Sequence, residues 1–136
     1  MRAKTDNPAS LDIGLLLYPG AQRAAVHGLT DLFTVANRVA AELGAVELPQ
    51  IRVSHWQVDE AGLLQWVEDS GSEAATALRV MIIPPSLDSA PNAELLARHR
   101  LPLNQLHGRG TVLASVCIGV FFIAASGLLD GRPACT

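Results

Sequence analysis

The sequence predicts an α/β protein with a doubly wound, mainly parallel sheet. Two observations lead to this fold class. Short apolar runs recur along the chain, helical patterns separate most of them, and Pro or Gly residues end several of them as turns do. Apolar residues make up 49% of the 136 residues and charged residues 17%, which suits one domain with a substantial core. Sheets of this kind bind ligands at the carboxyl ends of their strands.

The first part of the chain predicts a strand followed by a helix. Residues 1–10 are polar, so we expect a flexible tail there. Residues 11–18 form a mostly apolar run, which is typical of a central parallel strand. From Thr30, a favourable N-cap residue, apolar positions recur at helical spacing until Gly44. This pattern predicts an amphipathic helix that ends at Gly44.

A hairpin is expected next. Residues 51–58 alternate between apolar and polar side chains, as a half-buried strand does, and a turn separates them from a short strand at 63–67. Alternation places neighbouring side chains on opposite faces of the sheet. We therefore expect Trp56 in the core and His55 at the surface.

The second half predicts two further buried strands. Residues 78–83 are apolar and are stopped by two Pro residues. Two short helices are expected at 92–99 and 102–107, followed by a strand at 112–116. Residues 132–136 follow an Asp-Gly turn and have the pattern of the start of another strand.

Basic residues form one loose cluster along the predicted helices. His99 and His107 lie near Arg98, Arg100 and Arg109. Such a cluster can attract an anion, but a solvated helical face is the reading we favour. The ten Lys and Arg residues of the chain are outnumbered by thirteen Asp and Glu, and the net charge is −3. This balance argues against a nucleic-acid surface within these residues.

The stretch from residue 111 onward carries the strongest local signal. Cys117 lies between two apolar runs, and Gly119 follows two positions later. A strand, a sharp turn and a helix in this order form a nucleophile elbow, whose helix amino-terminus favours a thiolate. Gly119 would let the helix approach the strand closely. Taken alone, such a cysteine is more often a small buried hydrophobe, and the uncharged run also raises the question of a membrane span.

Cysteine usage and the amino-terminus bear on location. The two cysteines, Cys117 and Cys135, lack the spacing of a zinc site and fit a reducing compartment, where we expect no disulfide between them. The first residues lack the apolar core of a signal peptide. We therefore expect a cytoplasmic protein with no metal, no other cofactor and no membrane association.

Several stretches resemble one family. The elbow at residues 115–119 and the Gly-Leu-Leu-Asp-Gly-Arg segment at 127–132 resemble the ThiJ/PfpI proteins, relatives of the class I glutamine amidotransferases. The likeness is greatest to the ThiJ/PfpI-like amino-terminal domain of AraC-type transcriptional regulators. Residues 18–22 match the end of that family's first strand, 31–33 its first helix and 81–84 the strand before its glycine pair.

This resemblance covers residues 11–136 and implies a flavodoxin-like, three-layer fold. Members of the family continue with further strands and helices and then with a helix-turn-helix DNA-binding domain. The resemblance therefore implies a truncated domain, a homodimer, and DNA binding only through a segment beyond the chain end. It also implies an unknown small-molecule effector, with these ligand-pocket candidates: Cys117, Ile118, Pro85, Ser86, Ala25 and His27.

The sequence departs from the catalytic members of the family at two places. Ala25 occupies the position of their acidic residue, so it can give no acid-base help to the cysteine. His27 lies close by, but a histidine in such a segment is more often merely solvated or hydrogen-bonded. Pro85 replaces a glycine whose N–H can line an oxyanion site, although the amide of Ser86 remains. Loss of such a donor typically costs about 3 kcal/mol in the transition state.

These departures predict a catalytically inactive effector-sensing and dimerisation domain of an AraC-type regulator. One alternative is a ThiJ/PfpI-like hydratase or amidase that acts through the Cys117 thiolate. Another is an interaction domain that binds no small molecule. An activity screen with a Cys117→Ala control separates the enzyme from the other two, and a helix-turn-helix pair encoded downstream would favour the regulator.

Overall fold

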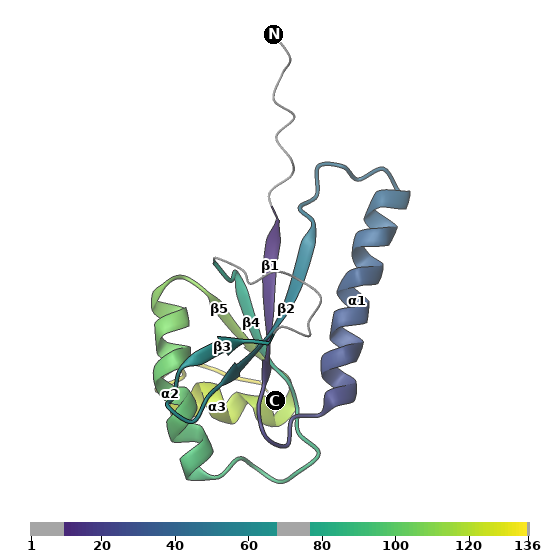
Figure 1. Ribbon diagram of the computed structural model, residues 1–136. Helices are drawn as coiled ribbons and strands as arrows, with labels where there is room; N and C mark the ends of the chain where they lie inside the picture. The colour runs from purple at the N-terminus through teal and green to yellow at the C-terminus, as the bar shows by residue number, and fades with distance from the viewer. Residues whose placement is uncertain (1–9, 68–76, 136) are drawn as a thin grey trace.

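The computed structural model describes residues 10–67 and 77–135 (Figure 1). It contains five strands, three α-helices and one short 3-10 helix within these ranges. In chain order they are β1 (Leu11–Leu17), α1 (Arg23–Glu42), β2 (Ile51–Val58), β3 (Leu64–Trp66), β4 (Val80–Ile83), α2 (Ala93–Gly108), β5 (Val112–Ser115), η2 (Cys117–Gly119) and α3 (Val120–Ala125).

The strands form one sheet in the order β3-β2-β1-β4-β5. β1 pairs in parallel with β2 and β4, β4 pairs in parallel with β5, and only β3 is antiparallel to its neighbour. The prediction of an α/β protein with a mainly parallel sheet is therefore confirmed. Helix α1 connects β1 to β2, which lies toward the β3 edge of the sheet. Helix α2 connects β4 to β5, which lies at the opposite edge. Because both crossovers are right-handed by preference, the two helices lie on opposite sides of the sheet (Figure 1).

Helix α1 begins earlier than the sequence predicted. It starts at Arg23, whereas Thr30 was expected to cap it. The Thr30 hydroxyl instead donates to the Val26 carbonyl oxygen one turn back, at 2.9 Å. A threonine inside a helix can make this bond as readily as a capping bond, so its side chain misled the prediction. The predicted end is confirmed, because Gly44 follows the helix with a left-handed backbone (φ 68°).

Two further expectations were wrong. The two short helices form one helix, α2, with Pro102 inside it. Proline removes one helical hydrogen bond, but the helix is capped by Asn92, which accepts from the Leu95 amide at 2.8 Å, and it buries Leu103 against the sheet. The strand expected at 132–136 is also missing from its described part, 132–135, which pairs with none of the five strands. Without a hydrogen-bonded neighbour, this segment does not form a strand.

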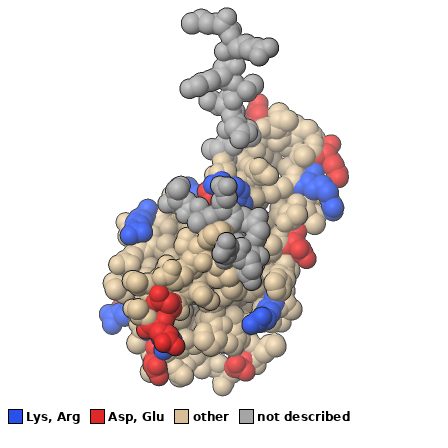
Figure 2. All heavy atoms as spheres, viewed as in Figure 1, with Lys and Arg blue, Asp and Glu red and all other residues tan. Residues whose placement is uncertain are grey.

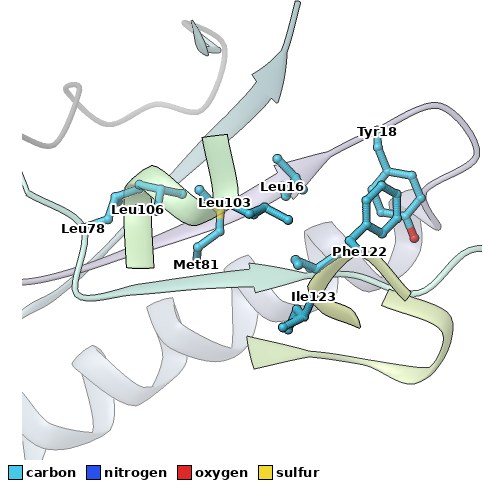
Figure 3. Close-up of a cluster of buried hydrophobic side chains, with 9 residues drawn as sticks. Leu16, Tyr18, Leu78, Met81, Leu103, Leu106, Phe122 and Ile123 are labelled. Carbon is cyan, nitrogen blue, oxygen red and sulfur yellow. The ribbon is translucent and has the colours of Figure 1, made fainter. Parts of the chain in front are cut away.

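The main core lies between the sheet and the layer formed by α2 and α3 (Figure 3). Leu16 and Met81 come from neighbouring central strands, and they meet Leu103 of α2 and Phe122 of α3. All four side chains are fully buried. This layer fixes α3, and therefore the turn that precedes it, against the carboxyl ends of β4 and β5.

Candidate functional site

Cys117 lies at a sharp turn between β5 and α3. Val116 is still extended, whereas Cys117 has φ 51° and is the only described residue other than glycine with a positive φ. Residues with side chains pay a steric penalty in this region, and such strain is common at functional sites. The thiol is exposed. The predicted strand, turn and helix around Cys117 are confirmed.

Gly119 allows this turn to sit close to the neighbouring strand. A Cβ atom at Gly119 would lie 2.5 Å from the carbonyl oxygen of Ile83, far inside van der Waals contact. The Val116 amide donates to the same Ile83 oxygen at 3.0 Å. The prediction that Gly119 permits a close approach is confirmed, and the strand approached is β4.

Tyr18 follows β1 directly and packs against α3, and nothing in the sequence singled it out as a site residue. Its hydroxyl donates to the Pro84 carbonyl oxygen at 2.6 Å, and its ring centroid is 4.6 Å from that of Phe122 (Figure 3). Burial, and secondarily the Cys117 thiol, raise the pKa of Tyr18 to about 12. Tyr18 is therefore a neutral phenol at physiological pH, and its proton is already donated to a backbone oxygen.

Ala25 and His27 lie in the first turns of α1. Ala25 is half-buried and His27 is exposed. His27 lines a cavity of about 280 Å³ at the carboxyl ends of β1 and β2, together with Tyr18 and His55. The rings of His27 and His55 meet edge to face, with centroids 6.3 Å apart. Cys117 is not among the residues that line this cavity, so the structure groups His27 with His55 instead.

His55 is buried, which corrects the expectation that it lies at the surface. Its Nε2 atom is 3.0 Å from the Thr30 hydroxyl oxygen. Because that hydroxyl donates to the Val26 carbonyl, it accepts from the His55 ring. Alternation correctly put His55 and Trp56 on opposite faces of β2, but α1 covers the face that was assumed to be open.

Pro85 and Ser86 connect the end of β4 to the segment after β1. The Pro85 carbonyl oxygen accepts from the Gln22 amide at 2.8 Å, and Ser86 forms an antiparallel bridge with Ala21. The Ser86 hydroxyl accepts from the Asp88 amide at 2.9 Å. Ser86 also lines a second cavity, of about 390 Å³, which shares Tyr18 with the first.

Ile118 completes the predicted set. It follows Cys117 in the 3-10 turn and is half-buried. The structure thus distributes the six candidates along the carboxyl edge of the sheet: Cys117 and Ile118 after β5, Pro85 and Ser86 after β4, and Ala25 and His27 in the helix that follows β1.

His99 is almost completely buried, with 1% of its surface exposed, so the expectation of a solvated position was wrong. Its Nδ1 atom lies 2.8 Å from the Leu95 carbonyl oxygen, and its ring meets Phe122 edge to face at 5.0 Å. Among the described residues, Nε2 has no hydrogen-bond partner. Burial lowers the pKa of His99, the bond to Leu95 opposes this shift, and the nearby Arg98 adds to it.

Metal sites and membrane spans were both sought within the described ranges. No group of three or more His, Cys, Asp or Glu side chains there is arranged to hold a metal ion. Within the same ranges, every helix is too short or too polar to cross a membrane.

Comparison with known proteins shows a shared fold. No protein-family model matches the sequence. The chain is 28% identical over 122 residues to an uncharacterized protein in the cpoL 5′ region of Streptomyces lividans, covering 90% of this chain and 84% of that protein. The fold of the chain described here is similar to that of an AraC family transcriptional regulator from Pseudomonas putida, with a TM-score of 0.62 and 17% identity over 90% of this chain. A second solved protein, from Vibrio parahaemolyticus, has a TM-score of 0.53 and the same identity. The chain spans 64% of the length of each solved protein.

Proposed function

We propose that this chain is the effector-sensing and dimerisation domain of an AraC-type transcriptional regulator, without catalytic activity. The observation that carries the proposal is the elbow at Cys117, set in a fold shared with a solved AraC family regulator. In this proposal the domain is of the ThiJ/PfpI kind, with a flavodoxin-like, doubly wound sheet. The protein is cytoplasmic, and DNA binding belongs to a segment outside these 136 residues.

The effector site in this proposal is the carboxyl edge of the sheet. Parallel sheets bind small molecules at this edge. Two cavities lie there, one lined by His27 and the other by Ser86, and Tyr18 lines both. Tyr18 also contacts the Pro84 carbonyl oxygen and the Phe122 ring of α3, so in this proposal a molecule bound in either cavity acts on the elbow through Tyr18.

The absence of catalysis is supported by three residues at the carboxyl edge of the sheet. Ala25 has no titratable side chain, and Pro85 has no amide hydrogen to offer an oxyanion. Tyr18 donates its proton to Pro84 and has a raised pKa, so it is a poor base at neutral pH. A cysteine nucleophile needs a base or a lowered pKa to become reactive.

A cysteine-dependent hydratase or amidase is the second candidate. The strained and exposed position of Cys117 favours it, because nucleophile elbows have this backbone geometry. This candidate requires turnover that depends on the thiol. Replacement of Cys117 by Ala would abolish such turnover while leaving the fold intact.

A DNA-binding measurement tests whether this chain senses the effector while another segment binds DNA, as proposed. Figure 2 shows that, on the face drawn, Lys and Arg side chains lie singly and do not gather into one basic patch. Specific DNA recognition needs phosphate contacts from such residues and side chains that reach base edges. In a fluorescence-anisotropy titration with the promoter DNA of its own gene, we expect this chain alone to bind without sequence specificity. Specific, salt-sensitive binding by the chain alone would contradict the proposal.

A further inference from the structure

The two cavities at the carboxyl edge of the sheet differ in charge. The cavity of about 280 Å³ has these basic and amide side chains in its lining: Arg23 and His27 of α1, and His55 and Gln57 of β2. No Asp or Glu is among the described residues that line it, and we call it the histidine cavity. The neighbouring cavity of about 390 Å³ is lined by Asp88 and by no described Lys, Arg or His. A negatively charged ligand therefore fits the histidine cavity better than its neighbour.

The basic side chains converge because of their spacing along two elements. Arg23 and His27 are four residues apart, so they lie on one side of α1 in successive turns. His55 and Gln57 are two residues apart on β2 and share one face of the sheet. The rings of His27 and His55 meet with their centroids 6.3 Å apart. The helix pair and the strand pair thus face each other across the cavity.

Arg23 is free to pair with a ligand. Its side chain is exposed and forms no ion pair within the described part of the chain. It is the first residue of α1, whose amino-terminal end lies at the bottom of the view beside the carboxyl end of β1 (Figure 1). The first turn of α1 contains no acidic residue, and its N-cap residue, Gln22, makes no side-chain capping bond. The partial positive charge of the helix end therefore adds to that of the guanidinium.

The rest of the lining is apolar. Val26 is 2% exposed, and Leu17 and Val67 are half-buried. The cavity volume lies near the lower end of the range for small-molecule sites, about 300 Å³, so its ligand is small. A ligand with a charged head and a short apolar chain suits this lining. The head remains at the exposed residues Arg23 and His27, while the chain leaves water and packs against Val26.

We propose that the histidine cavity binds a small aliphatic monocarboxylate, with the carboxylate at Arg23 and His27. The planar guanidinium of arginine can donate two parallel hydrogen bonds to a carboxylate. His55, which is held by the Thr30 hydroxyl at 3.0 Å, forms a fixed wall on the sheet side. The inference rests on the proposed function where it identifies this ligand as the effector. Binding of the carboxylate itself does not depend on that role.

An NMR titration of the full chain tests the site and the chemical class together. The ligands are the straight-chain monocarboxylates from propanoate to hexanoate and their primary amides. We expect saturable amide shifts around the histidine cavity, with a dissociation constant of roughly 1 mM for hexanoate. Hexanamide should bind at least about tenfold more weakly, because it lacks the charge that Arg23 recognises. No saturable carboxylate binding, equal binding of hexanamide, or shifts confined to Ser86 and Asp88 would overturn the inference.

Two variants separate charge recognition from the shape of the cavity. Arg23→Gln should weaken hexanoate binding roughly tenfold and leave hexanamide binding unchanged. Arg38→Gln, at an exposed arginine farther along α1, is the matched control and should change neither. Gln57→Phe keeps every charge but fills the cavity from an exposed position, so it should abolish binding while circular dichroism shows an intact fold. Equal losses in Arg23→Gln and Arg38→Gln, or full binding by Gln57→Phe, would contradict the inference.

The DNA measurement of the proposed function distinguishes the two proposals. Hexanoate binding that Arg23→Gln weakens supports the carboxylate site even if the chain alone binds DNA specifically, a result that contradicts only the proposed function. A chain that lacks carboxylate binding and also lacks specific DNA binding contradicts only the carboxylate site.

Discussion

The two faces of the sheet are covered very differently. On one face, α2 and α3 bury Leu16, Met81 and Phe122 completely. On the other, α1 packs along β2, and the apolar side chains on its outer side, Leu32, Val35, Val39 and Leu43, are exposed. On β5, Val112 remains 59% exposed. The comparison indicates that the α2–α3 layer supplies most of the stability of this chain and holds the elbow, whereas the outer side of α1 leaves apolar side chains exposed.

Removal of a large side chain from a buried and from an exposed position of α3 tests whether packing of the α2–α3 layer on the sheet stabilises the chain. Phe122→Ala empties a fully buried site, and we expect it to lower the free energy of unfolding by about 3–5 kcal/mol. Phe121 precedes it on the same helix and is 45% exposed. Phe121→Ala is the matched control and should cost about 1 kcal/mol or less. Chemical denaturation of both variants measures the difference, and equal losses would refute the layer assignment.

The approach of the elbow to β4 gives the next largest effect. Gly119→Ala puts a methyl group against the backbone oxygen of Ile83, which cannot move without disturbing the sheet. We expect a loss of about 1–3 kcal/mol in unfolding free energy. At Gly108, an added Cβ meets no atom of the described chain, so Gly108→Ala should be close to neutral. Thermal melts of the two variants compare them directly, and an undisturbed Gly119→Ala protein would contradict the observed contact.

Protonation of His99 should produce a smaller effect, confined to acidic pH. Its pKa in the folded chain lies below the ordinary value of 6.5, so the unfolded chain takes up the proton first. Stability should be full above about pH 6.5 and should fall as the pH drops toward the lowered value. His99→Gln removes the titration while keeping a side chain able to donate to Leu95.

Urea unfolding of both proteins at pH 7.5, 6.0 and 5.0 measures this effect. The parent protein should lose more stability across this range than His99→Gln. A parallel decline in the two proteins would assign the acid sensitivity to other groups.

The sequence predicted correctly those features that depend on the preferences of a few neighbouring residues. The elbow follows from a strand-forming run, Cys117 and Gly119 within a few residues, and each of these preferences acts over that distance. The end of α1 at Gly44 is local in the same way. The start of α1 was missed because Thr30 can bond either as a cap or back along the helix, and the local sequence does not distinguish the two.

Burial of the histidines was missed for a different reason. Whether His55 and His99 meet water depends on which element covers their face, and those elements are far away in the sequence. His55 lies under α1, and His99 packs on Phe122 of α3. The role of Tyr18 was missed on the same ground, because its bond to Pro84 joins residues 66 positions apart.

We propose that Cys117 has the geometry of a nucleophile elbow but no catalytic partner for its thiol. Turnover of amide and isonitrile substrates, measured with the parent chain and Cys117→Ala side by side, tests it most directly. We predict that the two proteins are indistinguishable from background, because Ala25 and Pro85 supply neither an acid-base group nor an oxyanion donor. Turnover by the parent chain that disappears in Cys117→Ala would contradict the claim.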